Sequence, residues 1–189
     1  MRRKPEIDDV LLNQGRHFVG GGNCRMRTVL GPGIVITLWN RARRIGAMSH
    51  FLLAIRDGQP LLELEGRYGE DTLQLVLRGL QWAGVELADC VARIFGSGNM
   101  LSREDRVPSL NSGQLIGDHA RRLLRAHRIP IVSERFDIHG CHEITFDVTT
   151  GRAHIRRIKP AVVATSAPAQ SIVPSNEPFG PEEAVNFGR

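Results

Sequence analysis

The chain has 189 residues, of which 41% are hydrophobic and 24% are charged. This length and balance are typical of a single globular domain that can bury a core. Neither a signal peptide nor membrane insertion is predicted, because acidic residues interrupt the basic N-terminus and no apolar run approaches the roughly 20 residues of a transmembrane helix. Three widely spaced cysteines do not form a paired disulfide framework, which favours a cytoplasmic protein with reduced thiols.

The formal net charge is +5, and basic residues cluster at 41–44, 121–128 and 156–159. Such clusters fit a nucleic acid, an acidic protein partner or simply solvated surfaces. Aromatic residues make up only 5% of the chain, so the stacking platforms of single-strand binders are scarce. We therefore do not expect a nucleic acid as partner.

The first third of the chain is predicted to be rich in strands. Residues 1–15 are interpreted as a lead-in segment, and 17–19 as a short strand before a run of three glycines. Residues 23–30 are extended. The continuous β-branched run at 34–39 predicts a strand buried on both faces, and 45–54 is the next strand.

Two helices are predicted in the rest of the chain. The first covers 68–83, where apolar residues recur at a spacing of three and four, and it ends at Gly84. The second covers 114–127 and stops before Pro130. Between and after the helices, strands are expected at 91–95 and 131–134, a surface loop at 100–112, and a hairpin of 143–148 with 152–158.

This mixture predicts an α/β (α+β) layered sandwich, in which mixed β-sheets pack with about two main helices in a single domain. The domain is expected to cover 1–159. Residues 160–189 are rich in alanine, proline and serine without periodicity, which predicts a disordered tail.

The stretch 28–51 holds the candidate site. Gly31, Pro32 and Gly33 interrupt an otherwise apolar run, and His50 lies on a strand that composition alone would place in the core. Glycine turns suit a catalytic site because their backbone N–H groups can approach a developing oxyanion. As a sequence feature alone, His50 is more typical of a structural histidine than of a catalytic one.

Residues 30–34 (LGPGI) and 45–52 (IGAMSHFL) resemble the L-G-S-C-V turn and the G-G-M-x-H-F-x-L strand of the CheD family, the chemoreceptor glutamine deamidases of bacterial chemotaxis. The chain is identified as a member of this family because further matches follow in the same order. These matches lie at 12–20, 67–69, 92–100, 116–117, 129–134 and 146–158.

The resemblance implies a cysteine-type protein-glutamine glutaminase, an amidohydrolase that needs no cofactor and no metal. His50 matches the catalytic histidine and is the expected general base, whereas Gly33 occupies the position of the nucleophilic cysteine. The amides of Gly31, Gly33 and Ile34 are candidates for the oxyanion contacts.

A catalytic-site threonine of the family aligns without gaps on Arg27, with Thr28 one position away. The family's asparagine in I-G-x-x-N falls on Ala120, and its D-x-G-G…G-R-K segment is shorter here.

Because Gly33 has no side chain, it cannot form a thioester, and deamidation is expected to be impaired. Replacing Gly33 by Cys together with Pro32 by Ser is expected to restore activity. Cys24, Cys90 and Cys141 remain alternative nucleophiles or inert thiols. The set His139, Cys141 and His142 is too tightly spaced for the usual structural zinc pattern, so no metal is predicted.

The resemblance implies methyl-accepting chemoreceptors as partners and, in some bacteria, a CheC-type phosphatase. Two hypotheses follow: a deamidase with impaired chemistry, or an inactive module that binds chemoreceptors or the phosphatase.

Overall fold

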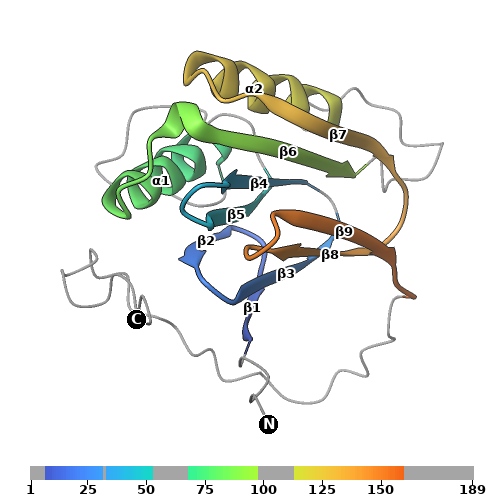
Figure 1. The fold of residues 1–189 in the computed structure, drawn as a ribbon. Helices are drawn as coiled ribbons and strands as arrows, with labels where there is room; N and C mark the ends of the chain where they lie inside the picture. The colour runs from blue at the N-terminus through green and yellow to red at the C-terminus, as the bar shows by residue number, and fades with distance from the viewer. Residues whose placement is uncertain (1–6, 32, 53–67, 98–112, 160–189) are drawn as a thin grey trace, which may run out of the picture.

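The computed structural model describes residues 7–31, 33–52, 68–97 and 113–159 (Figure 1). Within these ranges the chain forms nine strands, two α-helices and one short 3₁₀ helix. They are β1 (Asp8–Leu12), β2 (Arg16–Gly21), β3 (Cys24–Leu30), β4 (Ile34–Asn40), β5 (Ile45–Phe51), α1 (Gly69–Trp82), η1 (Leu87–Asp89), β6 (Cys90–Ser97), α2 (Gly113–Ala126), β7 (Ile131–Ile138), β8 (His142–Asp147) and β9 (Arg152–Arg157).

These elements stack in three layers, with both helices on one face of a five-stranded sheet and a four-stranded sheet on its other face (Figure 1). The larger sheet has the order β2-β5-β4-β6-β7, and the smaller one β1-β3-β8-β9. Among the strand pairs of the described residues, only β6–β7 and β1–β3 are parallel. The predicted layered α+β sandwich of mixed sheets with two main helices is thereby confirmed.

β4 lies at the centre of the larger sheet and contributes to both cores. Ile34, Ile36 and Leu38 pack toward the helices, whereas Val35 packs with residues of the smaller sheet. Because side chains alternate along a strand, one apolar run can supply two cores. The prediction of a strand buried on both faces is confirmed.

The helices cover the larger sheet with the faces that the sequence predicts. α1 buries Leu73, Val76, Leu77 and Leu80. It ends at Trp82, two residues before Gly84, whose φ of 71° is readily adopted by glycine. The Val85 amide donates to the Leu80 carbonyl at 3.0 Å. α2 connects the parallel strands β6 and β7, as such a pair requires.

The prediction of a lead-in segment over 1–15 is wrong for Asp8–Leu12, which form β1 beside β3. This strand depends on a partner distant in sequence, and Asp9 accepts an ion pair from Arg27 at 2.9 Å. β7 also continues to Ile138, beyond the predicted 131–134, because it follows β6. The predicted loop at 100–112, the tail at 160–189 and the end of the predicted strand 45–54 lie outside the described residues.

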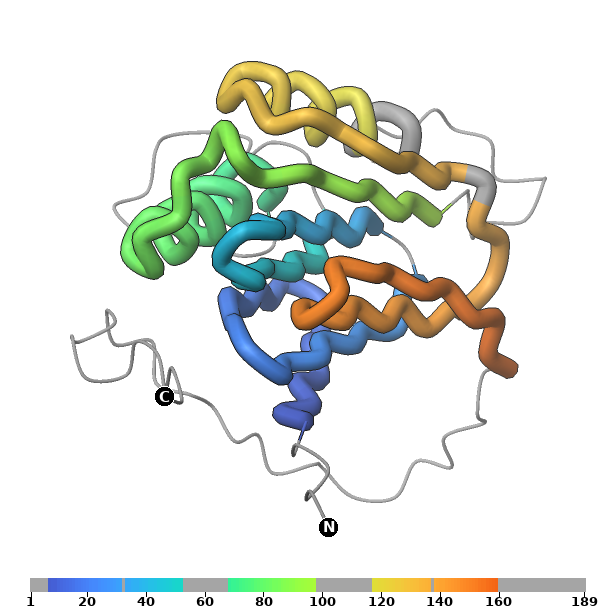
Figure 2. Tube along the Cα trace, viewed as in Figure 1, coloured from blue at the N-terminus to red at the C-terminus, as the bar shows by residue number. Residues whose placement is uncertain are grey.

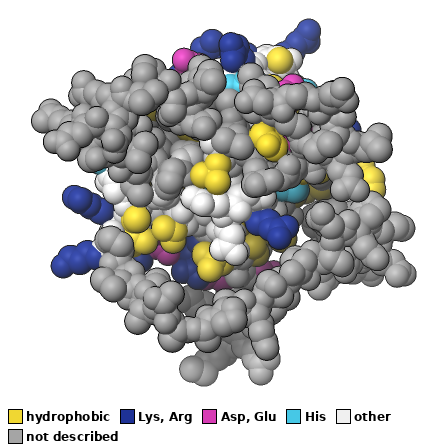
Figure 3. Space-filling model, turned by 180° about the vertical axis from the view of Figure 1, so that it is seen from behind, with side chains coloured by type: hydrophobic (Ala, Val, Ile, Leu, Met, Phe, Trp, Pro, Cys, Tyr) yellow, Lys and Arg dark blue, Asp and Glu magenta, His cyan; other side chains and the backbone are white. Residues whose placement is uncertain are grey.

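One face of the molecule is seen from behind in Figure 3. Where described residues are visible, hydrophobic side chains form separate small groups, and Lys and Arg side chains project at separate places. No helix among the described residues is long and apolar enough to cross a membrane.

Candidate active site

Thr28 and His50 meet between the two sheets. Thr28 lies in β3 and His50 in β5, and Thr28 Oγ1 is 2.9 Å from His50 Nδ1. The two residues are 1% and 0% exposed, so this contact is shielded from water. His50 pairs with Val35 of β4, whose side chain also faces the smaller sheet. The sheet packing therefore brings together two residues that belong to different sheets.

The second hydrogen bond of Thr28 indicates that Nδ1 of His50 carries a hydrogen. The Thr28 hydroxyl donates to the Leu12 carbonyl at 2.8 Å. A hydroxyl has one proton, so toward His50 it acts as the acceptor, and Nδ1 of His50 carries a hydrogen. In the neutral imidazole the basic lone pair is then on Nε2. This is the arrangement in which an orienting group presents a histidine as a general base.

The turn between β1 and β2 covers one side of this pair. Besides the Leu12 carbonyl, it supplies the Gly15 amide, which donates to the His50 carbonyl at 2.7 Å. Gln14 Nε2 lies 3.9 Å from the position that a Cβ on Gly31 would occupy. These contacts are not predicted from the sequence, because residues 1–15 carry no local signal for regular structure.

The structure separates Arg27 from Thr28 by the alternation of β3. Arg27 points to the outer face of the smaller sheet, where its guanidinium pairs with Asp9 at 2.9 Å and with Glu143 at 3.5 Å. Thr28 points inward to His50. The residue that contacts the histidine is therefore Thr28 and not Arg27, although Arg27 is the gap-free match to the family's threonine.

Gly33 occupies a backbone conformation that disfavours any side chain. Its φ is 116°, which L-residues rarely adopt. A Cβ there would lie 2.5 Å from the Phe51 carbonyl oxygen and 3.2 Å from Leu52 Cδ2. The Gly33 carbonyl also accepts a hydrogen bond from the Ser97 amide at 3.2 Å. These contacts argue against the expected restoration by Gly33→Cys unless the turn rearranges; Pro32 lies outside the described residues.

The cysteines are not gathered at this site. Cys24 precedes Thr28 by four positions on β3, which places it roughly 13 Å away along the strand. Burial, reinforced by Asp8 and Asp9, raises the pKa of its thiol to about 11. Burial and Asp89 raise the pKa of the Cys90 thiol to about 11 as well. Both thiols are therefore poor sources of thiolate near neutral pH.

Cys141 is partly exposed and precedes His142, which pairs with Leu30 next to the glycine turn. Among the described residues, no group of three or more His, Cys, Asp or Glu side chains is arranged to hold a metal ion.

Comparison with known proteins identifies the family. A family model described as CheD chemotactic sensory transduction matches residues 54–157. A protein of Albidiferax ferrireducens named "Probable chemoreceptor glutamine deamidase CheD 2" is 42% identical over 161 residues, which are 85% of this chain and 93% of that protein. The chain belongs to the CheD family.

Other CheD proteins are also similar over most of their length. "Probable chemoreceptor glutamine deamidase CheD 3" of Dechloromonas aromatica is 34% identical, covering 77% of this chain and 85% of that protein. Among solved structures, a Neisseria meningitidis protein of the DUF152 family gives a TM-score of 0.44 at 11% identity, covering 74% of each chain. The match to the CheD family model begins after His50, so it does not include the glycine turn or the Thr28–His50 contact.

Proposed function

We propose that this CheD protein binds glutamine-bearing segments of methyl-accepting chemoreceptors in the cytoplasm, and that its own deamidation chemistry is impaired. The observation that carries the proposal is an oriented Thr28–His50 pair beside a glycine, Gly33, that offers no nucleophile. The names of the CheD relatives support a chemoreceptor as the target. The three free cysteines are consistent with a reducing compartment.

The chemistry explains why the missing thiol matters. Conversion of glutamine to glutamate by a CheD-type reaction needs a thiolate to attack the side-chain amide carbon, release of ammonia, and hydrolysis of the thioester by water. His50 Nε2 is suited to accept and return the proton. Without an acyl acceptor at Gly33, only binding and amide contacts remain, and the loss is expected to be several orders of magnitude.

Release of ammonia and binding should be measured on the same chemoreceptor cytoplasmic fragment. We expect the wild-type protein to bind the fragment in a pull-down and in calorimetry, and to release no ammonia above background. Binding and ammonia release are also measured for His50→Ala and for the control His127→Ala, because His127 is an exposed histidine in the helix layer. The absence of binding to the fragment would contradict the proposal.

Cysteine variants test whether a relocated nucleophile operates. Ammonia release that is lost in Cys141→Ser would show that the thiol beside the glycine turn has replaced the family's cysteine. Cys24→Ser should change nothing, given its distance from Thr28 and its raised thiol pKa. A pull-down with a CheC-type phosphatase, run in parallel, separates the receptor-binding role from the alternative phosphatase-binding role.

A further inference from the structure

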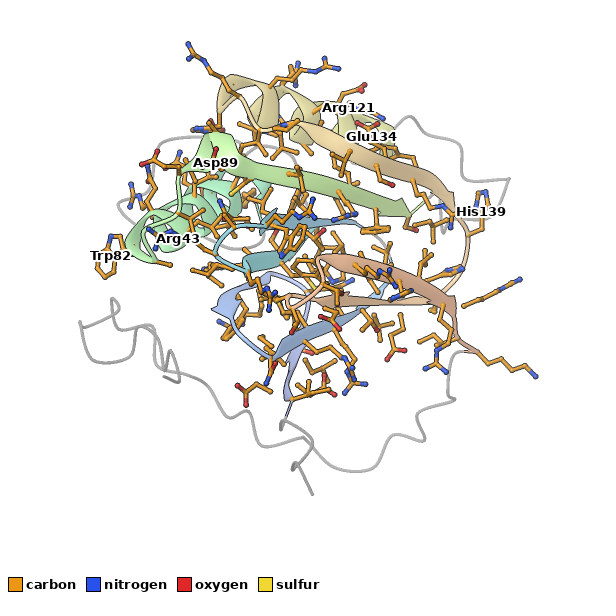
Figure 4. All side chains as sticks on the ribbon, viewed as in Figure 1. Arg43, Trp82, Asp89, Arg121, Glu134 and His139 are labelled. Atoms are coloured by element: carbon orange, nitrogen blue, oxygen red, sulfur yellow. The ribbon has the colours of Figure 1, made fainter. Side chains whose placement is uncertain are left out.

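The chain passes from β7 of the larger sheet directly into the smaller sheet (Figure 2). Residues of β7, β8, β9 and the β7–β8 connection line a hollow of about 340 Å³. His139 stands at the end of β7 beside this passage (Figure 4). We call this hollow the cationic cleft, and it is lined by Arg135, Ile138, His139, His142, Ile155 and Arg157.

The lining of the cationic cleft is basic and free of carboxylates within the described part of the chain. Four of its six side chains are arginine or histidine. No ion pair engages Arg135 or Arg157 among the described residues, so both guanidinium groups remain available to an incoming anion. Guanidinium groups bind carboxylates through paired, charge-assisted hydrogen bonds.

Two glutamates whose side chains are described adjoin residues that line the cleft, and both pair with other arginines. Glu134 precedes Arg135 and pairs with Arg121 of α2 at 2.7 Å. Figure 4 shows Arg121 and Glu134 close together and apart from His139. Glu143 follows His142 and pairs with Arg156 at 2.7 Å. Because neighbouring residues of a strand point to opposite faces, each glutamate is directed away from the cleft that its neighbour lines.

The cationic cleft lies beside the candidate active site. His142 pairs with Leu30, about 5 Å across the smaller sheet, and Leu30 leads directly into the glycine turn. On the other wall, Ile138 pairs with Ser97, whose amide donates to the Gly33 carbonyl. Both walls of the cleft are therefore one strand away from residues that hold the turn.

We propose that the cationic cleft binds a glutamate or aspartate side chain of the same protein segment whose glutamine approaches Thr28, Gly33 and His50. This inference rests on the proposed function and specifies the chemistry of the target: an acidic segment, with a carboxylate a few residues from the glutamine. The cleft thus sets which glutamine is presented, through charge rather than through an apolar surface.

A second basic hollow provides the matched control. It has a volume of about 410 Å³ and is lined by Trp39, Arg41, Arg44, Thr149 and Thr150. Arg41 follows the end of β4 opposite to Gly33, about 26 Å along the strand. The double variant Arg41→Gln/Arg44→Gln removes the same charge as Arg135→Gln/Arg157→Gln, but far from the candidate site.

The test measures binding of the full-length protein to the chemoreceptor cytoplasmic fragment by calorimetry at about 50 and about 300 mM salt. We expect Arg135→Gln/Arg157→Gln to raise the Kd about tenfold at low salt and to flatten its salt dependence. The control pair should change the Kd less than about twofold, because its charges lie far from the bound segment. Equal weakening by both pairs would show a general charge effect and would overturn the inference.

Two further probes separate this inference from the proposed function. If the wild type and Arg135→Gln/Arg157→Gln bind the fragment with the same Kd, the inference about the cationic cleft is overturned and the proposed function stands. Binding of a glutamate-rich peptide without glutamine, lost in that variant, would support the cleft even where the fragment fails to bind. Binding of inorganic phosphate but of neither polypeptide would overturn the inference in favour of a free-anion site.

Discussion

Two buried threonines, one in each sheet, differ in what their hydroxyls contact. Thr28 bonds both the Leu12 carbonyl and His50, whereas Thr37 Oγ1 is buried without a hydrogen-bond partner among the described residues. Both are 1% exposed. At this scale the cost of losing a hydroxyl depends on its partners rather than on burial alone.

Thr28→Val should lower the free energy of unfolding by about 1–3 kcal/mol, because the Nδ1 hydrogen of His50 and the Leu12 carbonyl lose their partner in a dry site. Thr37→Val is the control of the same shape and should be neutral or stabilising, since it removes an unsatisfied hydroxyl. Urea denaturation of both variants measures the difference. Equal losses would contradict the role of the Thr28 hydrogen bonds.

A comparison of Gly33 with Gly22 distinguishes the cost of backbone strain from the cost of a steric clash. Both have positive φ, of 116° and 66°, but a Cβ on Gly22 meets nothing within 4 Å. Gly22→Ala should therefore cost about 1 kcal/mol, and Gly33→Ala about 2–4 kcal/mol because it also meets the Phe51 carbonyl. Urea denaturation at one pH compares them. A Gly33→Ala variant as stable as Gly22→Ala would show that the turn rearranges easily, and would revive Gly33→Cys as a route to activity.

At the scale of elements, Phe136 holds α2 against the larger sheet. The Phe136 ring occupies the space that a Cβ on either Gly117 of α2 or Gly96 of β6 would need. The Arg121 guanidinium also lies over this ring, 4.3 Å from its centroid. Two glycines therefore form the slot for one aromatic ring. Arg121 extends this contact by pairing with Glu134 of β7 at 2.7 Å.

Gly117→Ala should destabilise the protein by about 1–3 kcal/mol because the new methyl group meets the Phe136 ring. In an unhindered helix the same change would stabilise by about 0.5–1 kcal/mol, so the sign identifies the slot. Thermal denaturation should give a lower Tm for Gly117→Ala than for wild type. In a Phe136→Leu background the penalty should largely disappear, and an unchanged penalty there would refute the contact.

At the scale of the whole molecule, buried histidines couple folding to pH. His119 lies in α2, 7% exposed, and burial lowers its pKa below the ordinary value of 6.5, with Arg122 acting in the same direction and Glu70 opposing. Burial also lowers the pKa of His17, with Arg16 contributing. These histidines therefore take up protons at a higher pH in the unfolded chain than in the folded protein.

The free energy of unfolding should fall as pH decreases from about 6.5 toward the lower pKa of the folded protein, since the unfolded state takes up protons first. Above about pH 7 this contribution is fully present. His119→Gln should reduce the loss between about pH 7.5 and 5.5. The urea denaturation midpoint, measured at both pH values, tests this. An equal fall of the midpoint for wild type and His119→Gln would contradict it.

Local patterns in the sequence were sufficient for the central strand, both helices and the C-terminal hairpin. The apolar run of β4 and the three-and-four spacing of α1 are local signals, and each element formed where its own side chains predict it. The motif matches around Gly33 and His50 also identified the family and the region of the candidate site. None of these depends on which strands lie together.

Only the tertiary structure decided what depends on contacts between distant segments. β1 exists because β3 pairs with it, and Thr28 rather than Arg27 meets His50 because the inward face of β3 is set by packing against the other sheet. The conformation of Gly33 depends on β5 and β6. The cationic cleft depends on β7 of the larger sheet and on β8 and β9 of the smaller one. Composition and spacing record local preferences, whereas these features follow from register between strands that are far apart in the chain.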